Sequence, residues 1–179
     1  SLFFPGETVF ATLTTGISSA TGLSLNRGHV WHFSGAVSAS SPGQFPSGVD
    51  IASDANNTWS TRLGDVDGDG DLDLIVGNNG QVNRLYRGSG SGGFLSGSDI
   101  TADGHNTLSI SSSDVDGDGD LDLIAGNLSQ VNRLYLGDGS GGFSSGTDIT
   151  SDAHQTYSLG VADVNGDGNL DLVAGNFGA

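Results

Sequence analysis

A period of 49 residues constrains the fold of this chain more than any other feature of its sequence. An Asp-rich segment begins at Asp65, again at Asp114 and again at Asp163, so that both intervals are 49 residues. Other residues keep this spacing without insertion or deletion: Phe45, Phe94 and Phe143; Gly48, Gly97 and Gly146; Asp50, Asp99 and Asp148; Thr58, Thr107 and Thr156. A fixed period of this length predicts a tandem array of one repeated supersecondary unit.

Each unit is predicted to consist of short strands separated by turns. Alternating apolar residues and Gly-rich boundaries favour strands over helices, and no stretch shows helical periodicity with caps. In the first unit we expect strands over 58–63, 71–76 and 82–86, turns at Gly77–Asn78 and 88–93, and one strand face formed by Leu72, Leu74 and Val76. A unit of about 40 to 50 residues with four short strands has the size of a β-propeller blade. The expected fold class is therefore all-β, with tandem four-stranded antiparallel blades of β-propeller type.

The phase of the repeat predicts how the chain is divided. Residues 1–32 are expected to form a non-repeating apolar arm, and residues 33–179 three circularly permuted 49-residue repeats. Two of these repeats are 48–96 and 97–145, and the third combines 33–47 with 146–179. Closed propellers contain four to eight blades, so three blades predict a propeller that is incomplete or open as a single chain.

The N-terminal arm is apolar and rich in strand-forming residues. Leu2–Phe4 and Val9–Thr14 carry this character, and an exposed sheet edge readily accepts such a segment. Two interpretations remain open. The arm packs on its own chain as a cap or an extra strand, or it pairs with the open blade edge of another copy.

Charge narrows the class of partner. The chain carries 21 acidic residues against 5 basic residues, all of them Arg, and its formal net charge is -16. Thirteen of the acids lie in the three Asp-rich segments, where a bound divalent cation would relieve their repulsion. The few Arg residues cannot form the basic surface that nucleic acid requires. No apolar run approaches the ~20 residues needed to span a bilayer, so we expect no membrane span.

The Asp-rich segments have the residue types and spacing of calcium loops. Calcium takes six to eight oxygen ligands, and Gly at the sixth position permits a sharp turn. We expect side-chain ligands at positions 1, 3, 5 and 9 and a backbone carbonyl at position 7, which leaves the side chain at position 7 free. The candidate metal-binding residues are Asp65, Asp67, Asp69, Asp71 and Asp73; Asp114, Asp116, Asp118, Asp120 and Asp122; and Asp163, Asn165, Asp167, Asn169 and Asp171. Three calcium sites are expected, and calcium is the only cofactor expected.

Position 12 separates these loops from the EF-hand type. An EF-hand has a bidentate Glu at that position, whereas this chain has Val76, Ala125 and Ala174. Magnesium is disfavoured because it rarely uses all-protein cages. In the third loop Asn165 replaces an Asp, which lowers the charge of that loop, and we expect its site to be the weakest of the three.

Residues 65–76, 114–125 and 163–174 share the motif Asp-x-Asp/Asn-x-Asp-Gly-x-x-Asp followed by an apolar strand. This motif resembles the FG-GAP, or VCBS, repeat of integrin-alpha-type β-propellers. The resemblance covers residues 48–179 and does not include the first 32. It implies blades whose calcium loops join two strands, extracellular use, and roles in adhesion, in carbohydrate binding or as an accessory of a secreted enzyme.

These observations favour a secreted calcium-binding structural repeat protein that assembles with itself in an extracellular fibre, surface layer or adhesive matrix. No nucleophile or base motif accompanies the loops, so we do not expect an enzyme. Two alternatives remain: a lectin-like carbohydrate-binding propeller that uses aromatic residues such as Trp59 and Tyr157, and an accessory domain of a secreted polysaccharide-degrading enzyme. The expected location is extracellular or at the cell surface. Expected partners are other copies, bound through the N-terminal arm and open blade edges, and carbohydrate in the alternative.

Overall fold

The structure is a computed structural model that describes residues 8–13, 29–34, 48 and 50–178. The chain separates into two compact units, residues 1–49 and residues 50–179, and each is described by itself. The first unit contains an antiparallel pair, β1 (Thr8–Leu13) and β2 (His29–Ser34). Thr8 lies opposite Ser34 and Leu13 opposite His29. Strand β1 covers residues 9–13 of the strand-forming segment identified in the arm.

The second unit contains three antiparallel sheets, which we call blades 1, 2 and 3. Blade 1 contains β3 (Thr58–Gly64), β4 (Asp73–Asn78), β5 (Arg84–Tyr86) and β6 (Ser98–Asp99). Blade 2 contains β7 (Thr107–Ser113), β8 (Asp122–Asn127), β9 (Arg133–Tyr135) and β10 (Thr147–Asp148). Blade 3 contains β11 (Gln155–Ala162) and β12 (Asp171–Phe177). The all-β prediction is confirmed, and the described residues contain no helix long and apolar enough to cross a membrane.

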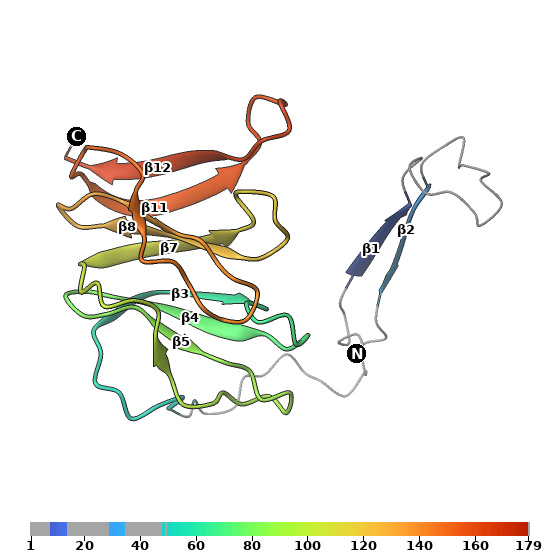
Figure 1. Ribbon diagram of the computed structural model, residues 1–179, viewed down its shortest axis with the longest axis horizontal. Helices are drawn as coiled ribbons and strands as arrows, with labels where there is room; N and C mark the ends of the chain where they lie inside the picture. Colours follow the sequence, from blue (N-terminus) through green and yellow to red (C-terminus); the bar gives the residue numbers. More distant parts are fainter. Residues whose placement is uncertain (1–7, 14–28, 35–47, 49, 179) are drawn as a thin grey trace. The chain divides into compact units, whose positions relative to one another are not determined.

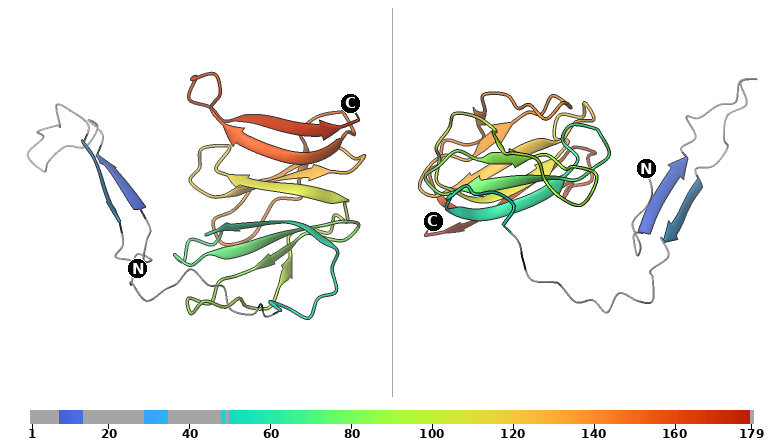
Figure 2. Two further views of the ribbon diagram at one scale, coloured as in Figure 1. Left: turned by 180° about the vertical axis from the view of Figure 1, so that it is seen from behind. Right: turned by 90° about the horizontal axis from the view of Figure 1, so that it is seen from below.

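Each blade is a meander in which consecutive strands are hydrogen-bonded neighbours. In blade 1, Gly64 at the end of β3 lies opposite Asp73 at the start of β4, so residues 65–72 form the connecting loop. Each blade also has a register shift near the start of its first strand, at the same repeat position: between Thr58 and Ser60, between Thr107 and Ser109, and between Thr156 and Ser158. Figures 1 and 2 show the three blades in a row, with blade 2 between the other two. No sheet closes on itself among the described residues.

The second strand of blade 1 lies two residues further along the chain than the predicted strand over 71–76. A turn was expected at Gly77–Asn78, and this expectation is wrong because β4 continues through Asn78. The backbone N–H of Asn78 donates to Asn83 Oδ1 at 2.9 Å, and its side-chain Nδ2 donates to the Val82 carbonyl at 2.8 Å. Asn78 therefore ends the strand and holds the turn that follows it. Leu72 does not share a buried strand face with Leu74 and Val76, because it precedes β4 and is exposed.

The main core lies between blades 1 and 2. Ile75 and Leu85 of blade 1 pack with a set of apolar residues from blade 2: Ile110, Leu123, Ala125 and Tyr135. On the opposite face of blade 1, Leu74, Val76 and Tyr86 form a second cluster. The middle strand β4 is consequently buried along its whole length. Burial on both faces explains why β4 and β8 are nearly continuous apolar runs.

Blade 3 has two described strands where blades 1 and 2 have four. We predicted that 33–47 supplies, in phase, the segment that this blade lacks. Residues 35–47 lie outside the described residues, so the circular permutation stays a prediction.

Candidate metal sites in the Asp-rich loops

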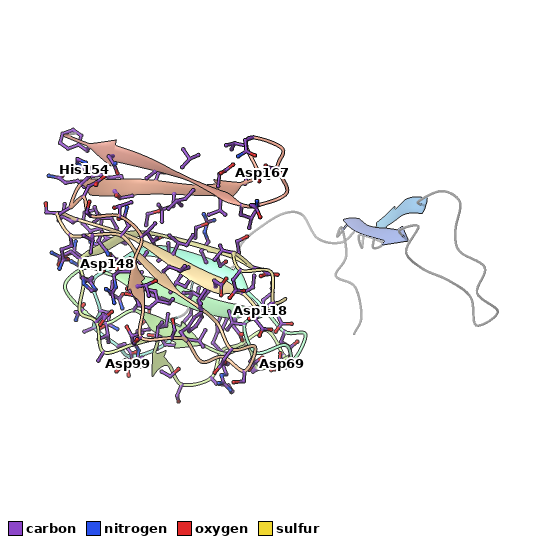
Figure 3. All side chains as sticks on the ribbon, turned by 45° about the horizontal axis from the view of Figure 1, so that its top comes forward. Asp69, Asp99, Asp118, Asp148, His154 and Asp167 are labelled. Atoms are coloured by element: carbon purple, nitrogen blue, oxygen red, sulfur yellow. The ribbon has the colours of Figure 1, made fainter. Side chains whose placement is uncertain are left out.

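The Asp-rich loops occupy the same place in every blade, between its first and second strands. They are residues 65–72 between β3 and β4, 114–121 between β7 and β8, and 163–170 between β11 and β12. Asp69, Asp118 and Asp167 are the fifth residues of the three loops and follow one another along one side of the row of blades (Figure 3). The predicted placement of the loops between strands is confirmed.

The curl of each loop depends on two glycines and a set of Asp side chains. Gly68 and Gly70 have φ values of 73° and 91°, in the left-handed region that Gly adopts without a steric penalty. The N–H of Gly70 donates to Asp65 Oδ2 at 3.0 Å, and the N–H of Asp71 donates to Asp69 Oδ1 at 2.8 Å. These hydrogen bonds to the carboxylates hold the loop backbone in its curled conformation, and the curl in turn brings the carboxylates close together.

Carboxylate oxygens converge in two of the three loops. In the first loop Asp65, Asp67 and Asp73 place one oxygen each within 4.8 Å of one another. In the second loop the group is Asp114, Asp116 and Asp118, which are positions 1, 3 and 5 rather than the positions 1, 3 and 9 of the first loop. The third loop forms no group of three acids among the described residues, since Asn165 stands at its third position.

The donor set of the first loop fits a calcium ion. All its side-chain donors are hard carboxylate oxygens, the ligand type that Ca²⁺ prefers. Asp65 Oδ1 is buried and has no hydrogen-bond partner among the described residues. An orphaned buried carboxylate oxygen is costly unless something positive binds it. A cation held by Asp65, Asp67 and Asp73 would satisfy this atom.

Crowding of like charge is visible in the second loop. Partial desolvation raises the pKa of Asp116, and the neighbouring carboxylates of Asp118, Asp122 and Asp114 raise it further. The N–H of Asp118, which donates to Asp116 Oδ1 at 3.2 Å, acts in the opposite direction. A divalent cation in this loop would remove the repulsion that makes ionisation of Asp116 unfavourable.

The ninth residue of each loop was predicted to be only a ligand, but the structure gives it a second role. Asp73 is fully buried, and its Oδ2 and Oδ1 accept hydrogen bonds from the N–H groups of Val66 at 2.9 Å and Gly88 at 2.7 Å. In blade 2, Asp122 accepts from Gly137 in the same way, at 2.9 Å. This Asp therefore fastens the loop to the turn after the third strand. The sequence signal for this contact is the repeat phase shared by Gly88 and Gly137.

The seventh residues, Asp71 and Asp120, lie against the Gly-rich turn of their own blade. A Cβ added at Gly90 would lie 2.6 Å from Asp71 Oδ2, so the turn passes close to this carboxylate. Neither side chain belongs to the groups of converging oxygens, in agreement with the backbone role that we expect for position 7. The third loop differs, because Asn169 Nδ2 donates to Asp167 Oδ1 at 3.0 Å.

The model of a family described as FG-GAP-like repeat matches the chain twice, over residues 65–125 and 114–174. Each match runs from the start of one Asp-rich loop into the strand that follows the next loop. The chain belongs to the FG-GAP-like repeat family. The resemblance seen in the sequence is thereby confirmed. No curated protein shows significant similarity to this chain.

The third FG-GAP-like loop replaces charge repulsion with amide hydrogen bonds. The N–H of Gly168 donates to Asp163 Oδ2 at 2.9 Å and is the main cause that lowers the pKa of Asp163. The N–H of Asn169 and then the Asn165 amide lower the pKa of Asp167. The bond from Gly168 has equivalents in the other two loops, whereas the side-chain amides of Asn165 and Asn169, which donate to Asp167 at 3.1 and 3.0 Å, belong to the third loop alone. These amides already satisfy the Asp167 oxygens, so a cation gains less by binding them.

Changing Asn165 to Asp is expected to tighten calcium binding at the third loop. The added carboxylate gives the third loop an acid at each of the expected side-chain ligand positions 1, 3, 5 and 9, as in the other two loops. Ligand charge is a main determinant of calcium affinity. We expect the dissociation constant of this site to fall roughly tenfold, about 1.4 kcal/mol. Isothermal titration of this variant and of the conservative variant Asn165→Ser checks it. Equal affinities for all three loops in the unchanged chain would contradict the ranking.

Arg87 connects the first FG-GAP-like loop to blade 2, and sequence reasoning missed it. Its Nη1 lies 3.5 Å from Asp67 Oδ2, and its Nη2 donates to the Ser140 carbonyl at 2.8 Å. The N–H of Gly141 donates to the Val66 carbonyl of the same loop at 3.0 Å. No repeat signal marks Arg87, because blade 2 has Leu136 at this phase.

Two pairs of residues at equivalent repeat positions make equivalent contacts in successive blades. Arg84 pairs with Asp99 of its own blade, and Arg133 with Asp148. His105 and His154 occupy equivalent repeat positions just before the first strands of blades 2 and 3. Their backbone carbonyls accept hydrogen bonds from the preceding blade, where the donors are the N–H groups of Gly80 at 3.2 Å and Ser129 at 3.1 Å.

Proposed function

We propose that this chain is a secreted, non-enzymatic calcium-binding structural repeat protein that associates with copies of itself in an extracellular fibre, surface layer or adhesive matrix. The observation that carries the proposal is the group formed by Asp65, Asp67 and Asp73, with the orphaned oxygen of Asp65 buried among them. FG-GAP-like repeats and a formal net charge of -16 support the same function.

Calcium would stabilise the fold of this protein rather than take part in a reaction. Each loop joins the first two strands of a blade, and the first loop also contacts blade 2 through Val66 and Arg87. At extracellular calcium concentrations, a site of ~10⁻⁴ M affinity stabilises the fold by at most about 1.5 kcal/mol. Three such sites together are comparable with a large share of the 5–15 kcal/mol that stabilises a typical domain.

Removal of calcium with EDTA is therefore expected to lower the melting temperature of the full chain. A loss of at most about 4 kcal/mol corresponds to roughly 10 °C for a chain of this size. Differential scanning calorimetry with millimolar calcium, with EDTA and with magnesium in place of calcium measures it. Magnesium should restore little of the stability, because its octahedral geometry suits these loops poorly. Identical melting curves in all three conditions would refute calcium binding.

Self-association is supported by the open end of blade 3. Strand β12 pairs only with β11 in the described part of the chain, and an unpaired strand edge is a template for a strand from another molecule. The strand-forming N-terminal arm is a second candidate for such pairing. Size-exclusion chromatography with and without EDTA, on the full chain and after deletion of residues 1–32, tests this part of the proposal. A monomer in every condition would refute it.

Carbohydrate binding is a second candidate function, and one observation favours it. The rings of Tyr157 and Phe177 meet edge to face with centroids 6.2 Å apart. With Gly175 and Asn176 they line a surface pocket of about 420 Å³. Aromatic rings beside an amide are a common way to hold a sugar. A glycan array discriminates between the two functions, because a purely structural protein binds no glycan specifically.

A further inference from the structure

We propose that the outward face of blade 3 binds the outward face of blade 1 of a second copy, so that copies associate head to tail. The inference rests on the proposed self-association and names the surfaces that carry it. The outward face of blade 3 is the face turned away from blade 2, and it includes Val164, Val173 and Gly175. The outward face of blade 1 is the opposite end of the row, and it includes Thr58 and Thr61.

Residues at equivalent repeat positions show that, within the described part of residues 50–179, no blade covers the outward face of blade 3. Val66 of blade 1 is 4% exposed, whereas Val164 at the same repeat position is 65% exposed. Ile75 is fully buried, whereas its equivalent Val173 is 56% exposed. Val66 and Ile75 belong to the core formed with blade 2. The exposed apolar residues of blade 3 thus occupy the positions at which blade 1 contacts the blade that follows it.

The outward face of blade 1 shows the complementary pattern. Thr58 and Thr61 are exposed. Their equivalents in blade 2 are Thr107, fully buried, and Ile110, 1% exposed, and both lie against blade 1. Each end of the row therefore presents one half of an interface that the chain already builds between its own blades.

Three glycines at one repeat position show how closely neighbouring blades approach each other. At Gly77 an added Cβ would lie 3.0 Å from the γ-carbons of Thr107 and Ile110 of the next blade. At Gly126 it would lie 2.7 Å from Thr156 Cγ2. At Gly175 the only atoms of the described residues within 4 Å of an added Cβ belong to Ser158 of the same blade. The pocket of about 420 Å³ that Gly175 lines is where Thr58 and Thr61 of a second copy would lie.

Backbone hydrogen bonds repeat at the same junctions. The N–H of Gly80 donates to the His105 carbonyl, and the N–H of Ser129 donates to the His154 carbonyl. The next members of these two series are Gly178, as donor, and Asn56, as acceptor. We expect the N–H of Gly178 to donate to the Asn56 carbonyl of the neighbouring copy.

The partner is a second copy rather than the opposite end of the same chain. Figures 1 and 2 show blades 1 and 3 on opposite sides of blade 2, so their outward faces point away from each other. An interface between two different faces is heterologous, and such an interface builds a ring or an open filament rather than an isologous dimer.

Sedimentation velocity of the full chain in calcium tests the inference with two variants. Gly175→Val blocks the outward face of blade 3, and its φ lies outside the left-handed region, so its backbone tolerates valine. Thr61→Lys places a charge on the outward face of blade 1. We expect the unchanged chain to grow with concentration and each variant to associate at least tenfold more weakly. An equimolar mixture of the two variants should form dimers and stop, because only one intact interface remains between them.

Ser151→Lys adds the same charge at an exposed position and should associate like the unchanged chain. Circular dichroism melting confirms that every variant is folded. If both face variants assemble like the unchanged chain, the inference is overturned while self-association through a strand edge or the arm stands. If each variant forms dimers with itself, the interface is isologous and the inference is also overturned. If the unchanged chain stays monomeric at every concentration, the inference and the proposed self-association both fail.

Discussion

Replacing Asp122 with alanine is expected to lower the free energy of unfolding by about 3–5 kcal/mol, the largest effect of any single change in the loops. Asp122 is fully buried, and its two carboxylate oxygens accept hydrogen bonds from the N–H groups of Val115 at 2.7 Å and Gly137 at 2.9 Å. Alanine leaves both donors without a partner inside the protein. Urea denaturation of the full chain, in calcium and in EDTA, measures the loss.

Asp171→Ala is the matched control because Asp171 holds the same position in blade 3. It is only partly buried, and among the described residues it accepts one hydrogen bond, from the N–H of Val164 at 3.0 Å. We expect this change to cost about 1 kcal/mol. Most of the Asp122→Ala loss should persist in EDTA, because its backbone donors do not depend on metal. A loss that vanishes in EDTA would show that Asp122 acts only as a calcium ligand.

Replacing Gly126 with valine is expected to destabilise the chain by roughly 3 kcal/mol. The smallest addition at this position, a Cβ, would lie 2.7 Å from Thr156 Cγ2 and 3.2 Å from Thr156 Cβ. Thr156 is fully buried between blades 2 and 3, so it cannot move aside without separating the two blades. Chemical denaturation at one calcium concentration measures the change.

The three in-phase glycines provide an internal comparison for this prediction. Gly77→Val should cost somewhat less than Gly126→Val, since its nearest contacts are at 3.0 Å. Gly175→Val should be close to neutral in the monomer, because no following blade lies against it and valine favours strands. Equal losses at all three positions would mean that valine acts through the strand itself rather than through contacts between blades.

The position of the Asp-rich loops, their turns and the strands that flank them could be predicted from the sequence. These features are local, because each loop closes through contacts such as Gly70 N–H to Asp65 Oδ2, five residues apart in the chain. Because the sequence repeats every 49 residues, the same loop with its flanking strands is predicted in each of the three units. Arg84 and Arg133 share one repeat position, and each pairs with an acid of its own blade.

Contacts between segments distant in sequence could not be predicted in this way. The hydrogen bond from Gly88 N–H to Asp73 and the bridge that Arg87 makes to Ser140 depend on how turns fold back over a loop. The continuation of β4 through Asn78 was missed because its side chain forms the following turn, so that Gly77–Asn78 resembled a turn in sequence.

The sequence by itself determined the repeating unit of this protein, its strand-rich character and the acidic loops suited to calcium, because all three depend on neighbouring residues along the chain. Only the tertiary structure decided which copy of each repeated position is buried. Thr58 and Thr107 are the same residue at the same repeat position, yet Thr58 is exposed and Thr107 is fully buried. The physical reason is that burial is set by the neighbouring blade, and among the described residues each end of the row has a neighbouring blade on one side only.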